Sequence, residues 1–157
     1  RKLEEAYAQK DMPLDNVRIC IDNIMYLTNC FSEADRIDRI YINFCNPWPK
    51  SKHKKRRLTH PRQLVQYRML LDGEIWFKTD DDDLFEESLE YFKEAGFRIK
   101  QMTRNLHEEP QMRYFETEHE QMFDEMGKTI KFLIAEPDPS VSMDSLQDLL
   151  QYSERTH

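Results

Sequence analysis

Residues 43–50 read NFCNPWPK and run directly into SKHKKRR, so a rigid Pro-Trp-Pro turn precedes a dense run of cations. The chain as a whole is acidic, with a formal net charge of −7. A solvated loop would account for an arbitrary run of charge. Here the prolines restrict the backbone, and Trp48 offers a flat face on which a base can stack. Cations beside such a face can neutralise phosphates, which predicts contact with nucleic acid. The basic residues are Lys50, Lys52, Lys54, Lys55, Arg56 and Arg57.

Two further polar stretches could do chemistry. Residues 80–83 form an acidic run, and carboxylates suit Mg²⁺, but the last three open a predicted helix, where they complement its dipole. We therefore predict no metal and expect only Asp80 to face a site. Residues 117–120 read TEHE, the pattern of a capping box in which Thr117 reaches forward and Glu120 reaches back.

Hydrophobic periodicity places these stretches on an α/β fold. We predict strands at 17–21, 37–44, 74–79, 97–102 and 128–135, with helices at 3–10, 24–31, 81–95 and 118–126. A further helix opens at 59–61 with a capping hydroxyl from Thr59 and stops at Asp72-Gly73. Such alternation is typical of a mostly parallel sheet, in which ligands gather at the carboxyl ends of strands. Asp22, Asn43, Asn46 and Asp80 lie at or just beyond the ends of predicted strands, so we expect a site at that edge.

Composition narrows the class of protein. The 157 residues contain 39% hydrophobic and 11% aromatic side chains, enough for one folded domain. No apolar run approaches the roughly 20 residues that span a bilayer, so we expect no membrane association. The three cysteines show no CxxC pairing, which indicates reduced thiols and a cytoplasmic location. Monomer and homodimer both remain open.

Three ordered stretches then point to a family. NFCNPWPKSKHKKRRLTHP, GEIWFKTDDDDLFEESLEYF and TEHEQMF resemble the bacterial tRNA (guanine-N(7)-)-methyltransferases, which use S-adenosylmethionine. The resemblance covers residues 1–136 and implies a Rossmann-like class I methyltransferase sheet flanked by helices. It also implies that the family's first strands and Gly-rich donor loop lie upstream of this chain. We expect residues 1–136 to form the methyltransferase domain and 137–157 to form a linker and a short C-terminal helix or tail.

The resemblance also implies roles for individual residues. It assigns donor binding to Asp22, Asn23 and Asn46, and gives Asn46, between donor and substrate, the catalytic position. Substrate binding falls to Lys50, Asp80, Thr117, Glu118, His119 and Glu120, and tRNA contact to Lys52, His53, Lys54, Lys55, Arg56 and Arg57.

The sequence departs from the family pattern at two of these positions. Asn46 stands where the family has Asp, and His119 stands where it has Tyr. The implied activity is methyl transfer from S-adenosylmethionine to guanine N7 in tRNA. The alternative is a catalytically silent or truncated RNA-binding homologue.

Overall fold

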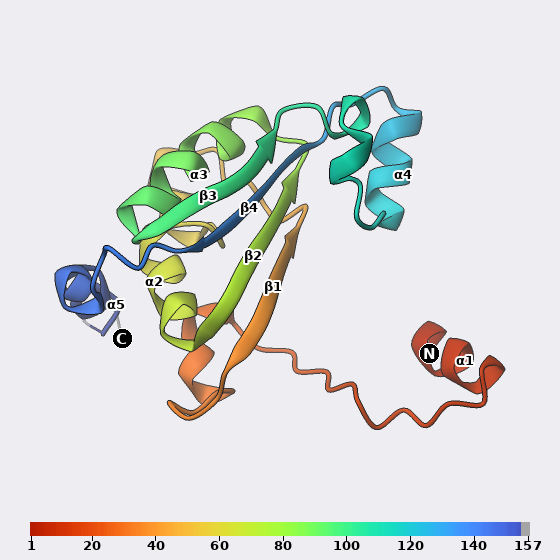
Figure 1. Cartoon of the computed structure of the whole chain (residues 1–157), viewed down its shortest axis with the longest axis horizontal. Helices are drawn as coiled ribbons and strands as arrows, with labels where there is room; N and C mark the ends of the chain where they lie inside the picture. The colour runs from red at the N-terminus through yellow and green to blue at the C-terminus, as the bar shows by residue number, and fades with distance from the viewer. Residues whose placement is uncertain (155–157) are drawn as a thin grey trace. The chain divides into compact units, whose positions relative to one another are not determined.

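The computed structural model describes residues 1–154 and groups them into two compact units, one from Arg1 to Phe31 and one from Ser32 onward. The second contains a four-stranded sheet in the order β1-β2-β4-β3 (Figure 1). Its strands are β1 (Ile37–Asn43), β2 (Leu71–Thr79), β3 (Phe97–Thr103) and β4 (Lys131–Pro137). Its α-helices are α2 (Pro61–Leu70), α3 (Asp82–Glu94), α4 (Glu118–Glu125) and α5 (Gln147–Glu154).

The sheet is mixed, and three of its four strands (β1, β2 and β3) point the same way, as the prediction of mostly parallel strands requires; only β4 is reversed. β1 and β2 run parallel, whereas β4 lies between β2 and β3 and is antiparallel to both. The α/β class itself is confirmed. An alternating or continuous apolar pattern indicates a strand but carries no information on which way that strand runs.

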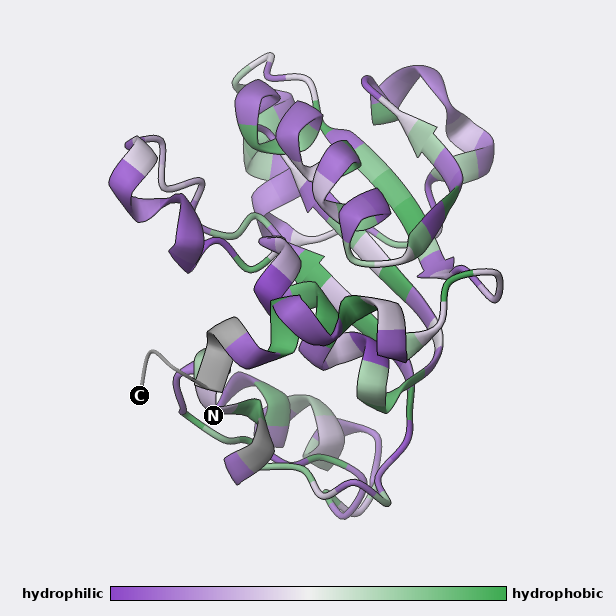
Figure 2. Ribbon diagram, turned by 90° about the vertical axis from the view of Figure 1, so that its left-hand side faces the viewer, coloured by the Kyte–Doolittle hydropathy of each residue, from purple (hydrophilic) through white to green (hydrophobic). Residues whose placement is uncertain are grey.

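The sheet packs on both faces, as the alternation of side chains along β2 requires. Phe77 points to one face and lies against Phe85 and Phe92 of α3, with ring centroids 6.3 and 6.4 Å away. Trp76 points to the other face. There it joins a buried cluster that also contains Leu106, Met112, Ile130, Phe132 and Ile134. In Figure 2 hydrophobic residues are concentrated on the strands, whereas the helices carry many hydrophilic ones.

The junction between α2 and β2 differs from the prediction. Asp72-Gly73 does not stop the helix; α2 ends at Leu70, and β2 starts at Leu71 and runs through Gly73. A Cβ on Gly73 would lie 1.9 Å from the carbonyl oxygen of Asp38 on β1, so only glycine allows this approach. The pairing of β1 with β2 shifts register at the same place, between Ile37 and Arg39.

Capping explains where two of the helices begin. The N-cap of α2 is His60, whose Nδ1 accepts from the Arg62 amide at 3.3 Å. Thr59, which we expected to cap, is instead buried and hydrogen-bonded to the Ser88 hydroxyl at 2.7 Å. Asp81 caps α3 by accepting from the Leu84 amide at 2.7 Å, as its place after a strand predicts.

Residues 137–154 stay in contact with the rest of the second unit and do not form a detached tail. β4 extends to Pro137, two residues beyond its predicted end. Arg68 of α2 then donates to the main-chain oxygens of Asp138 and Val141, and Leu146 is buried. A 3₁₀ turn (Met143–Leu146) leads into α5. The expected C-terminal helix is therefore present; the last three residues of the predicted tail lie outside the described residues.

The first unit contains helix α1 (Lys2–Gln9) and the 3₁₀ turn η1 (Ile24–Asn29). The predicted strand at 17–21 is wrong: these residues form no regular element, and Ile19 and Ile21 are 81% and 99% exposed. An apolar run becomes a strand only when a neighbour completes its hydrogen bonds. Among the described residues no strand pairs with this one. In the same residues, no helix is both long enough and apolar enough to cross a bilayer.

Candidate active site

The carboxyl ends of β1 and β2 lie side by side. The two strands pair in parallel register as far as Asn43 and Lys78, so the residues that follow each strand leave the sheet at one edge (Figure 1). Asn46 follows β1 and Asp80 follows β2. This convergence was predicted from the sequence. Asp22, which was also predicted to lie at this edge, belongs to the first unit.

The turn after β1 is held in an uncommon backbone conformation. Phe44 has φ of 50° and Trp48 has φ of 42°, in the left-handed region that non-glycine residues seldom occupy. The Asn46 side chain stabilises the turn, because its Oδ1 accepts from the Trp48 amide at 3.1 Å. An aspartate could make the same bond with one oxygen and present the other outward. Asn46 presents its Nδ2 amide instead, a donor in place of an acceptor.

The basic run divides into two groups. Arg57 is buried: its Nε donates to the Pro47 carbonyl at 2.7 Å and its Nη1 to Glu87 Oε2 at 2.8 Å. Lys54 pairs with the other oxygen of Glu87 at 2.6 Å. These two cations anchor the Pro-Trp-Pro turn to α3. The sequence reading missed this because Glu87 lies 30 residues beyond Arg57 and all six cations look alike in one dimension.

The other cations of the run lie on the surface. Lys50 and Lys52 are exposed, and so are Lys55 and Arg56. The Arg56 guanidinium carbon lies 5.2 Å from the centroid of Trp48, within cation–π range, and His53 meets the same ring edge-on at 5.8 Å. Within the run, the exposed cations and Trp48 form the surface that a phosphate backbone could reach.

Asp80, at the end of β2, is held by two lysines. Its Oδ2 accepts from Lys128 Nζ at 3.1 Å, and its main-chain oxygen accepts from Lys131 Nζ at 3.1 Å. Lys131 also pairs with Asp82 at the start of α3. The carboxylate is only partly exposed, so a ligand that uses it competes with Lys128.

The TEHE segment opens α4. Thr117 caps the helix by accepting from the Glu120 amide at 3.1 Å, as predicted. Glu120 does not reach back as a capping box would; it is fully buried, and its Oε2 pairs with Lys78 Nζ at 2.6 Å. Its Oε1 has no hydrogen-bond partner among the described residues. Glu118 and His119 are exposed, and the His119 ring stacks on Phe44 with centroids 5.9 Å apart.

The first unit carries the predicted donor-binding pair. Asp22 Oδ1 accepts from the Asn23 amide at 2.7 Å, and Asn23 Oδ1 caps η1 by accepting from the Met25 amide at 3.1 Å. Both side chains therefore accept hydrogen bonds from main-chain amides at the start of η1.

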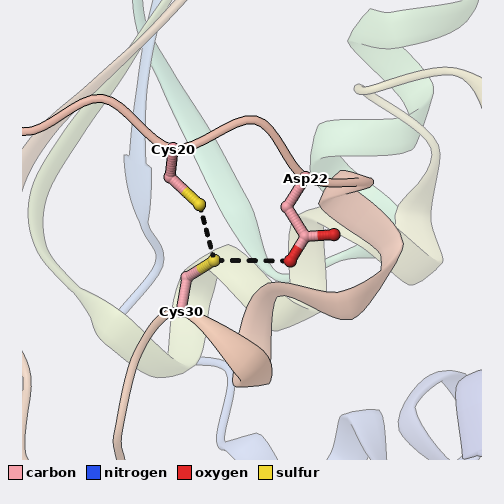
Figure 3. A group of neighbouring side chains, drawn as sticks. All are labelled: Cys20, Asp22 and Cys30. Atoms are coloured by element: carbon pink, nitrogen blue, oxygen red, sulfur yellow. Dashed lines mark hydrogen bonds between the residues drawn. The ribbon is translucent and has the colours of Figure 1, made fainter.

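Two cysteines, for which the sequence predicted only reduced thiols, lie beside Asp22 (Figure 3). Cys30 Sγ lies 3.4 Å from Cys20 Sγ and 3.6 Å from Asp22 Oδ2. The thiol hydrogen bond and the nearby anionic groups raise the pKa of Cys30 to about 11. Two sulfurs and a carboxylate can hold a metal ion, but all three side chains are exposed.

Comparison with known proteins identifies the family. Residues 1–133 match the family model described as "Putative methyltransferase". A tRNA (guanine-N(7)-)-methyltransferase of Clostridium beijerinckii is 59% identical over 140 residues, 88% of this chain and 64% of that protein. Enzymes of the same name from Clostridium botulinum and Clostridium perfringens are each 58% identical over 137 residues, 86% of this chain and 63% of each.

The chain thus spans less than two thirds of the length of these relatives. The matched part nevertheless contains the PWP turn, the basic run, the end of β2 and the TEHE segment. The chain belongs to this methyltransferase family.

Proposed function

We propose that the protein carrying this sequence transfers a methyl group from S-adenosylmethionine to N7 of a guanine in tRNA. The observation that carries the proposal is the edge of the sheet where β1 and β2 end. Asn46 and Asp80 leave that edge together, with a cationic surface following Asn46. The named relatives, at 58–59% identity, support the same chemistry.

The reaction needs little acid–base chemistry. Guanine N7 carries a lone pair and no proton, so it can attack the methyl carbon directly. The N7–carbon bond forms as the carbon–sulfur bond breaks, and the bonding electrons remain on sulfur. S-adenosylmethionine supplies the activated methyl group on its positive sulfonium. The protein has to hold the two reactants in line, which can contribute on the order of 7–11 kcal/mol.

We assign the positioning of guanine to the β2 edge and the start of α4. Asp80 and Glu118 are carboxylates that can accept from N1–H and the amino group, the donor edge particular to guanine. They also favour the positive charge that the ring gains on methylation. Thr117, His119 and Glu120 complete the segment, with Glu120 acting from the interior. Asp22 and Asn23 are proposed to contact the donor, and Asn46 and Lys50 to lie where donor and substrate meet.

We assign tRNA contact to the exposed part of the basic run. Lys52, His53, Lys55 and Arg56 carry the proposed phosphate contacts, and folded RNA is read there by shape and backbone charge. Lys54 and Arg57 stabilise this surface, because both form ion pairs with Glu87 of α3. We further propose a cytoplasmic monomer or homodimer without membrane contact, since exposed free thiols suit a reducing compartment.

The direct test is methyl transfer by the complete protein that carries this sequence. Purified protein, S-adenosylmethionine labelled in its methyl group and bulk unmodified tRNA should yield labelled 7-methylguanosine, identified by mass spectrometry of the digested RNA. Absence of the label, with tRNA binding retained, would instead favour a silent RNA-binding homologue. Failure of both would reject the proposal.

Asn46 decides between these two functions. Because its Oδ1 is engaged by the Trp48 amide, Asn46→Asp keeps the turn and adds an outward carboxylate oxygen. We expect methyl transfer at an equal or higher rate, by up to about tenfold, which is about 1.4 kcal/mol in the barrier. Asn46→Ala, which loses the turn as well, is the matched control and should be slower than both. A large loss of rate in Asn46→Asp would contradict the role given to this position.

A further inference from the structure

Lys78 is a lysine without access to solvent. Its side chain is 1% exposed, on the sheet face that also carries Trp76. Lysine is almost never buried to this degree unless it is paired. Its Nζ donates to Glu120 Oε2 and to the Phe115 carbonyl, both at 2.6 Å, and lies 4.0 Å from the centroid of the Phe115 ring. Three contacts thus converge on one ammonium group, and all come from the segment that opens α4.

Stability alone does not explain such a pair. The desolvation of two fully buried charges cancels much of their attraction, and apolar residues of equal volume often serve as well or better. What the pair does provide is a fixed geometry. It joins β2 to α4 across 42 residues of sequence, whereas a packed apolar side chain would allow α4 to slide or rotate.

The main chain of Lys78 links a second part of the site. Its carbonyl accepts from the Phe44 amide at 2.9 Å, at the start of the turn that carries Asn46. Phe44 in turn stacks on His119 of α4, and its ring lies 5.3 Å from that of Phe123. Asp80 follows Lys78 by two residues. Lys78 therefore contacts both the turn after β1 and the start of α4. It also lies two residues before Asp80, at the end of β2.

Resting on the function proposed above, we propose that Lys78 is the positioning residue of the guanine site. Its ammonium holds the first turn of α4 against the end of β2, so that Glu118 and His119 stand at a set place relative to Asp80 and Asn46. It also leaves Glu120 with one buried oxygen that has no partner among the described residues. Lys78 touches neither reactant; it acts through Glu120 and the Phe115 carbonyl.

The test compares Lys78→Met with Lys100→Met in the complete protein. Lys100 is the matched control, because its ion pair with Glu74 also joins two distant segments but is partly exposed, and in the described part of the chain neither residue contacts Glu120 through an ion pair. Two readouts are taken: KM for tRNA and kcat at saturating S-adenosylmethionine, and hydrogen exchange of the amides of residues 115–123. We expect Lys78→Met to raise KM for tRNA by about tenfold to a hundredfold, as misplacement of a binding group does. Exchange in 115–123 should accelerate, and Lys100→Met should change neither.

These readouts separate positioning from mere destabilisation, since a smaller folded fraction lowers apparent kcat and leaves KM unchanged. Should Lys78→Met fail to fold, the comparison moves to Lys78→Met with Glu120→Gln against Glu120→Gln alone, which avoids a stranded buried carboxylate. Unchanged KM and unchanged exchange would overturn the proposal. If the wild-type protein does not methylate tRNA, the proposed function fails; the exchange data still decide whether Lys78 orders α4.

Discussion

Arg57 and Lys78 are both buried cations paired with a glutamate, but their surroundings differ. The partner of Arg57, Glu87, is 34% exposed and also accepts from Lys54 and from the Tyr91 hydroxyl. The partner of Lys78, Glu120, has no exposed surface, and within residues 1–154 one of its oxygens has no hydrogen-bond partner. The first pair is open to water, and the second is closed.

In the open pair, Arg57–Glu87, several donors bind the same carboxylate, so the loss of one can be compensated by the others. Burial opposes ionisation of Glu87, yet hydrogen bonds from Lys54 and Tyr91 and the charge of Arg57 hold its pKa below the ordinary value. Loss of one donor leaves the carboxylate with others and with water. The closed pair has no such reserve, because removing Lys78 leaves a desolvated carboxylate. Equal burial of the cation therefore does not mean equal energetic consequence; exposure of the anion decides it.

The largest predicted effect tests this directly. Lys78→Met and Arg57→Met both keep a linear side chain and remove the charge. We expect Lys78→Met to lower the free energy of unfolding by about 3–5 kcal/mol, the cost of breaking a buried pair. Arg57→Met should cost about 1–3 kcal/mol, since the main loss is an unsatisfied Pro47 carbonyl. Urea denaturation of both variants gives the two values, and a larger loss for Arg57→Met would show that anion exposure does not govern the cost.

The second prediction concerns RNA binding and sharpens the division within the basic run. Lys52, Lys55 and Arg56 are exposed, so their joint replacement by Ala should reduce the slope of log affinity for tRNA against log salt by about 3. Arg57→Met should leave that slope unchanged, because a buried guanidinium bound to Glu87 neutralises no phosphate. Equal slopes for the triple variant and the wild type would mean that the exposed cations are only a solvated loop.

The third prediction uses pH. Burial lowers the pKa of His60 to about 4, helped by the positive charges of Arg62, Lys55 and Arg57. An unfolded histidine titrates near 6.5. Below that pH the unfolded chain binds a proton that the native protein refuses, so stability is complete above 6.5 and falls as pH drops toward 4. His60 is partly exposed, so after screening we expect a loss of about 1–2 kcal/mol.

His60→Asn is the control for this titration, because asparagine can still cap α2 but does not ionise. Thermal unfolding of both proteins between pH 7 and pH 4 should show a difference that opens only below pH 6.5. A parallel fall in both would assign the acid sensitivity to other groups. Such a result would also show that titration of His60 is not a source of pH dependence in the region around Arg57.

The two pairs also show how far the sequence alone reaches. Local signals placed β1 and α3 within a residue or two, since alternation and caps act over a few positions. The TEHE segment and the turn at Asn46 were found in the same way. The glutamate partners of Lys78 and Arg57 lie 30 or more residues away, so no local pattern reports them. The direction of β4 and the failure of residues 17–21 to form a strand depend likewise on neighbours.

The smallest predicted effect tests whether the remaining donors to Glu87 compensate for the loss of one of them. Tyr91→Phe removes a hydroxyl that donates to Glu87 at 3.0 Å and accepts from Arg57 at 3.3 Å, while the ring stays in place. Because Glu87 keeps Lys54 and Arg57, we expect a loss of only about 0.5–1 kcal/mol in the free energy of unfolding. Urea denaturation beside Arg57→Met measures it. A loss as large as that of Arg57→Met would mean that the three donors act as one unit rather than as replaceable parts, and that the open pair has no more reserve than the closed one.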